Sequence, residues 1–82
     1  MKLSDIKNRI NELCNAFVFE YNNKLCGIDP LNRNKFNMWY GENDVMTAKN
    51  IDEVMQTPFF NGMSLTNLIE KKLINEKNIV SY

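Results

Sequence analysis

The chain has 82 residues, 44% of them hydrophobic, with ten basic and ten acidic side chains and no histidine. This length leaves room for one domain over residues 1–82 and not for two, and the apolar content is too high for a disordered chain. Because the formal net charge is zero, the long-range attraction that favours binding to nucleic acid or to an anionic membrane is absent.

The first predicted element is an amphipathic helix. Apolar residues recur at three- and four-residue spacing from Leu3 to Phe17, which predicts a helix over residues 4–15. Ser4 is the expected N-cap, because its hydroxyl can accept a hydrogen bond from an unpaired backbone N–H of the first turn. Asp5 adds negative charge at the positive end of the helix dipole. The apolar stripe should pack on another element.

A β-hairpin is predicted next, because the apolar period changes to two at Phe17. Residues 17–21 and 24–28 form its strands, and Asn22 and Asn23 tolerate the positive φ angles of a tight two-residue turn. In this register Phe17 lies opposite Ile28 on the core face. The opposite face then carries Val18, Glu20, Leu25 and Gly27.

A second hairpin is predicted after Asp29 and Pro30, where the missing proline N–H should end the strand. Residues 35–40 and 45–49 alternate again around a turn at residues 41–44. If Tyr40 lies opposite Val45, the core face of this hairpin carries Phe36, Met38, Tyr40, Val45 and Thr47. The other face then carries Asn37, Trp39, Met46 and Ala48.

Two helices follow the hairpins. Asn50 and Glu53 have the spacing of a capping box, and Ser64 is the expected N-cap of a final helix. The tail, residues 76–82, either frays or docks as an edge strand. The element order predicts an α+β fold, a small antiparallel sheet of two β-hairpins with an N-terminal helix and two C-terminal helices on one face.

The sequence contains no recognisable catalytic, metal or cofactor motif. With no histidine and two cysteines twelve residues apart, zinc and redox sites lack their usual ligand spacing. Cys14 and Cys26 are interpreted as small core residues, and the three separate glycines form no phosphate-binding loop. We therefore expect no enzyme and no cofactor. A cysteine-dependent enzyme with Cys26 as nucleophile is the least favoured alternative.

The leading hypothesis is a small interaction protein. Four apolar side chains, Val18, Leu25, Trp39 and Met46, are predicted to lie together on the second sheet face, which in a small antiparallel sheet is usually polar. A patch of this kind favours a protein partner or a homodimer. The competing interpretation is that helices on both faces, or the tail, cover it.

A weak single-stranded nucleic-acid binder is the alternative function. Arg33 and Lys35 would supply a basic rim, with Trp39 and Tyr40 as stacking surfaces. No apolar run has the length of a signal peptide or a membrane span, so we expect a cytoplasmic protein without membrane contact. The many asparagines are typical of an AT-rich genome and would suit an accessory protein of a bacterium or phage.

Overall fold

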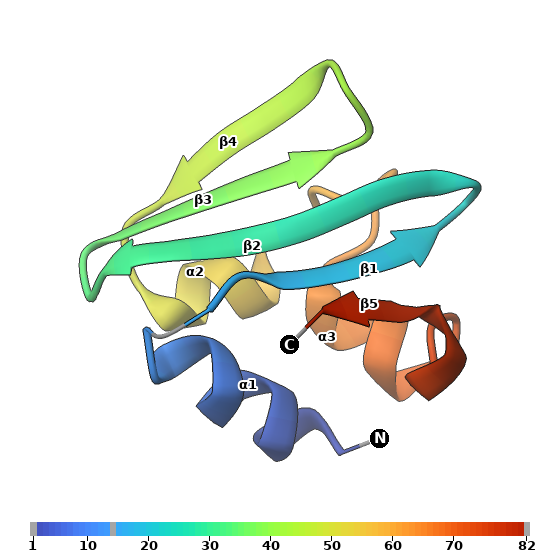
Figure 1. Cartoon of the computed structure of the whole chain (residues 1–82), viewed down its shortest axis with the longest axis horizontal. Coiled ribbons are helices and arrows are strands. Elements are labelled where there is room, and N and C mark those ends of the chain that lie inside the picture. The colour runs from blue at the N-terminus through green and yellow to red at the C-terminus, as the bar shows by residue number, and fades with distance from the viewer. Residues whose placement is uncertain (1, 14, 82) are drawn as a thin grey trace.

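The computed structural model describes residues 2–13 and 15–81, which form two layers: a five-stranded antiparallel sheet with three α-helices on one face (Figure 1). The sheet has the strand order β4-β3-β2-β1-β5. This α+β layout confirms the predicted fold class. The elements are α1 (Leu3–Asn11), β1 (Phe17–Tyr21), β2 (Lys24–Asn32), β3 (Lys35–Tyr40), β4 (Asp44–Ala48), α2 (Ile51–Gln56), α3 (Leu65–Glu70), a short 3₁₀ helix η1 (Glu76–Asn78) and β5 (Ile79–Ser81).

The first hairpin has the predicted register. Phe17 pairs with Ile28, and the pairing continues without a shift to the turn. Asn22 and Asn23 have φ angles of 56° and 60°, the left-handed values that a two-residue hairpin turn needs. Asparagine reaches these values more easily than most residues, so the local sequence is enough to fix this hairpin.

The prediction that the chain leaves the sheet at Pro30 is wrong. Pro30 pairs with Phe36, and β2 continues to Asn32 before turning into β3. The pairing of β2 with β1 ends at Ile28, so beyond that residue β2 has an open side where a missing N–H breaks no ladder hydrogen bond. The two predicted hairpins therefore belong to one continuous sheet.

The predicted register of the second hairpin is also wrong, by one residue. Tyr40 pairs with Asp44, and Val45 pairs with Trp39. The turn has three residues, 41–43, and begins at Gly41 with φ of 70°. Because successive strand side chains point to opposite faces, a shift of one residue moves each side chain of β4 to the other face. Met46 and Ala48 therefore lie on the helix side, and Val45 and Thr47 on the other.

The helix caps are partly as predicted. Asn50 accepts a hydrogen bond of 2.8 Å from the Glu53 N–H at the start of α2, and Ser64 caps α3 in the same way at 3.1 Å. The prediction for Ser4 is wrong: α1 begins one residue earlier, with Lys2 at the N-cap position and no side-chain cap. The helix still buries its apolar stripe, which decides its position better than a single cap does.

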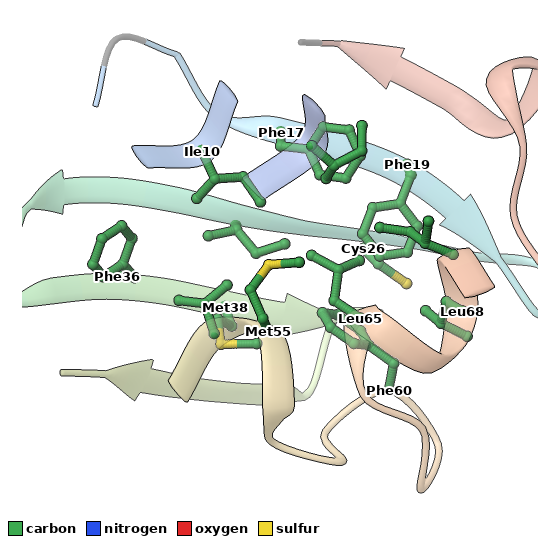
Figure 2. Close-up of a cluster of buried hydrophobic side chains, with 14 of the residues drawn as sticks. Ile10, Phe17, Phe19, Cys26, Phe36, Met38, Met55, Phe60, Leu65 and Leu68 are labelled. Carbon is green, nitrogen blue, oxygen red and sulfur yellow. The ribbon is translucent and has the colours of Figure 1, made fainter. Parts of the chain in front are cut away.

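The core lies between the helices and one face of the sheet. Phenylalanines from β1 and β3 meet aliphatic side chains from all three α-helices (Figure 2). Ile79 of β5 pairs with Phe19 and packs against the edge of this core. Within the tail, for which the sequence left two alternatives open, Ile79–Ser81 thus form the edge strand next to β1.

Candidate interaction surface

The sheet face turned away from the helices, called the outer face below, carries an apolar row that crosses four strands. Val18, Gly27, Trp39 and Val45 are successive cross-strand partners on β1, β2, β3 and β4. The helices lie on the opposite face (Figure 1). Val45 is 72% exposed, the largest value among the exposed large apolar side chains of the described residues. Val18 and Trp39 are half-buried, so three apolar side chains of this row remain partly open to water on a face that is ordinarily polar.

Trp39 lies flat on the sheet above Gly27. A Cβ placed on Gly27 would come within 2.4, 2.5 and 2.9 Å of three consecutive ring atoms, Cζ2, Cη2 and Cε2. An approach within the plane of the ring could bring at most two of these three atoms so close. The indole therefore rests with one face on the glycine, an arrangement in which an aromatic side chain covers the backbone of a cross-strand glycine.

Two open depressions flank the Trp39 ring on this side of the molecule. The first, of about 450 Å³, is lined by Asn23, Lys24, Leu25, Trp39, Gly41, Glu42 and Asn43. The second, of about 420 Å³, is lined by Asn37, Met38, Trp39, Val45, Met46 and Thr47. Trp39 lines both, so the indole lies between the two hollows. Side chains of a partner can fill such hollows around an aromatic anchor.

Polar and charged groups border the apolar row. On one side, Asp29, Asn37 and Thr47 are cross-strand partners, and the Thr47 hydroxyl donates a 3.1 Å hydrogen bond to Asn37 Oδ1. On the other side, Leu25 is 50% exposed and pairs with Glu20. An apolar centre with a polar rim is the usual composition of a protein–protein interface.

Three of the four predicted patch residues, Val18, Leu25 and Trp39, lie on the outer face. Met46 does not, because it faces the helix side and packs partly against the core. Val45 takes its place, and sequence reasoning missed it because the length of the turn decides which face of β4 it occupies. Gly41 marks the start of the turn but not its length.

The residues of the predicted nucleic-acid rim are not brought together. Tyr40 is buried on the helix side of the sheet, where its hydroxyl accepts a 2.8 Å hydrogen bond from Asn22 Nδ2. Arg33 and Lys35 lie at the β2–β3 turn, and Lys35 is four residues, about 13 Å, from Trp39 along β3. The two aromatic rings and the basic side chains therefore form no common stacking path.

Cys26 is fully buried between the sheet and the helices, and its thiol donates to the Lys24 carbonyl oxygen at 3.5 Å. Burial raises the pKa of the Cys26 thiol above its ordinary value of 9.0, against weaker opposing effects of nearby backbone groups. The reactive thiolate is thereby disfavoured. Cys14, the other predicted core cysteine, lies outside the described residues.

Within residues 2–13 and 15–81, no three His, Cys, Asp or Glu side chains lie close enough together to hold a metal ion. None of the helices described has the length and apolar content needed to cross a membrane. Comparison with protein-family models, with curated proteins and with solved structures found no match in any of the three.

Proposed function

We propose that the protein is a small non-catalytic interaction protein that binds a protein partner through the outer face of its sheet. The observation that carries this proposal is the row Val18, Gly27, Trp39 and Val45, which crosses four strands on the face opposite the helices. With Leu25 beside it, the row offers a continuous apolar surface with a tryptophan at its centre. Surfaces of this kind on monomers commonly serve as interfaces.

The shape of the outer face supports binding by an aromatic anchor. Trp39 is held in place by Gly27 beneath it, so little side-chain freedom is lost when a partner covers the ring. Tryptophan is among the commonest hot-spot residues, and its truncation typically costs about 2 kcal/mol or more of binding free energy. The hollows on both sides of the ring would receive side chains of the partner.

Affinity purification from the native cell tests the proposal. The native chain is compared with Leu25→Lys, which places a charge on the outer face opposite Glu20, where the folded monomer tolerates it. The control is Leu73→Lys, which replaces a leucine of similar exposure, 45% against 50%, in the segment after α3. We expect a partner to be lost with Leu25→Lys and retained with Leu73→Lys.

Trp39→Ala gives a second measurement on the same surface. Circular dichroism and thermal unfolding must first show that each variant is folded, since Trp39 also covers Gly27. Capture of the same partners by the native chain, Leu25→Lys and Trp39→Ala would refute binding through the outer face. If the captured partner is a cytosolic protein of a bacterium or a phage, that result would agree with the expected compartment and origin.

A further inference from the structure

The two edges of the sheet differ in how well they are protected. At one edge, β5 has three residues and joins β1 with a register shift between Val18 and Phe19. At the other edge, β4 pairs with β3 through five consecutive residues without a shift, and it contains neither proline nor lysine. Short strands, bulges, prolines and lysines are the usual devices that prevent edge-to-edge pairing. Only the β5 edge has such devices within the described chain.

We propose that a second copy of this chain pairs with β4 as an antiparallel strand, so that two sheets join into one around a two-fold axis. With Met46 opposite its own copy, Val45 lies opposite Thr47 of the second copy, and Asp44 lies opposite Ala48. All five residues of β4 are then paired. Residues directly opposite each other in a sheet lie on the same face. Because this register pairs the outer-face residue Val45 with the outer-face residue Thr47, the outer faces of both copies lie on the same side of the joined sheet.

The charges at the ends of β4 favour this partner and this register. Glu42 and Asp44 lie at its start, and Lys49 follows its end. The two-fold axis brings Lys49 of the second copy next to the acidic end of the first, and the reverse contact forms at the other end. A shift of two residues towards the start of β4 would instead bring the two Asp44 carboxylates closer together and pair fewer residues. Complementary charges thus select one register.

A hollow lies beside Asn43, the residue opposite which this register places Lys49 of the second copy. It has a volume of about 380 Å³ and is lined by Tyr40, Asn43, Asp44, Val45, Phe59 and Asn61. Asp44 is its one charged lining residue, so the hollow is suited to a single cationic side chain. The two copies meet along the free edge of β4, so this dimer does not depend on any binding by the outer face.

The expected dimer is weak. Pairing of five-residue strands buries less than the ~1,000–1,200 Å² of total surface typical of stable interfaces, so association should be transient. Sedimentation velocity therefore has to cover concentrations up to about 1 mM. The expected result is a concentration-dependent rise from the monomer mass of 9.6 kDa towards twice that value. A monomer at every concentration would overturn the proposal.

Disulfide trapping tests the register. In the Val45→Cys/Thr47→Cys variant, the thiol at position 45 lies directly opposite the thiol at position 47 of the second copy, and the reverse pair forms as well. Two disulfides should therefore form and give a covalent dimer on a non-reducing gel. The control, Val45→Cys alone, places the two thiols on a diagonal of about 7–8 Å, which a disulfide does not span well. Peptide mapping excludes cross-links through Cys14 or Cys26. Equal trapping of both variants would overturn the register.

Charge reversal and rescue test the contact at the ends of β4. Asp44→Lys should weaken the dimer about three- to tenfold, and Asp44→Lys with Lys49→Glu should restore it. Leu25→Lys, which alters the outer face, should leave the dimer unchanged. A dimer that is abolished by Leu25→Lys but insensitive to Asp44→Lys would refute edge pairing and would leave binding through the outer face standing. Capture of the same partners by Leu25→Lys and by the native chain, with the dimer retained, would refute the outer face alone and would leave edge pairing standing.

Discussion

Gly27→Ala is expected to destabilise the protein, although alanine is the better residue for a strand. The backbone at Gly27 does not have a positive φ, so alanine fits it without strain. The new methyl group, however, would lie within 3.0 Å of three atoms of the Trp39 ring. Because real Cβ atoms do not come so close to a neighbour, the indole must move off the sheet.

The magnitude follows from two opposing effects. Alanine in place of glycine in a strand gains about 0.5–1 kcal/mol from the smaller conformational entropy of the unfolded chain. Overpacking against a well-seated side chain costs about 1–3 kcal/mol. The second effect is the larger, so the free energy of unfolding should fall by about 1 kcal/mol.

A double-mutant cycle isolates the contact between Gly27 and Trp39. In a Trp39→Val background the ring is absent, so Gly27→Ala should change sign and stabilise the fold by about 0.5–1 kcal/mol. Urea unfolding followed by circular dichroism measures all four proteins. Trp39 is the single tryptophan of the chain, and its fluorescence should shift to the red in Gly27→Ala as the ring becomes exposed. Equal effects in both backgrounds, with unchanged fluorescence, would refute the flat packing of the indole.

Three further predictions concern the turn, a helix cap and the buried thiol. Asn22→Gly keeps the positive φ but loses the hydrogen bond to Tyr40, so it should destabilise by about 1 kcal/mol in urea unfolding, whereas Asn23→Gly should be neutral or stabilising. Asn50→Ala removes the cap of α2 and should cost about 1 kcal/mol by the same measurement, and an unchanged midpoint would contradict the cap. Cys26, in a Cys14→Ser background, should react with a thiol reagent only at the rate of unfolding. Because burial raises its pKa, the folded state holds the proton more tightly, and stability should fall as pH rises above 9.0.

The elements themselves were predictable because their signals are local. The spacing of apolar residues identified α1 and the strands, and Asn22 with Asn23 fixed the first turn and with it the whole register of β1 and β2. The caps Asn50 and Ser64 were predictable for the same reason, since a cap needs only the side chain and the first turn of its helix.

The composition of the outer face depended on features that the sequence does not specify locally. The sequence by itself determined the α+β class, the buried face of β1 to β3, and the positions of Val18, Leu25 and Trp39 on the other face. Only the tertiary structure decided that Val45 and not Met46 completes the row. One residue more or less in the turn moves every side chain of the following strand to the opposite face of the sheet.

The same holds for the contacts between strands. The sequence marks Gly27 as a weak strand residue, but the pairing of β2 with β3 is what places the Trp39 ring on it. The position of β4 at an edge depends likewise on the order of all five strands. Hydrophobic periodicity assigns side chains to faces, whereas strand order and register are set by packing across the whole sheet, and these decide which faces and edges remain open to a partner.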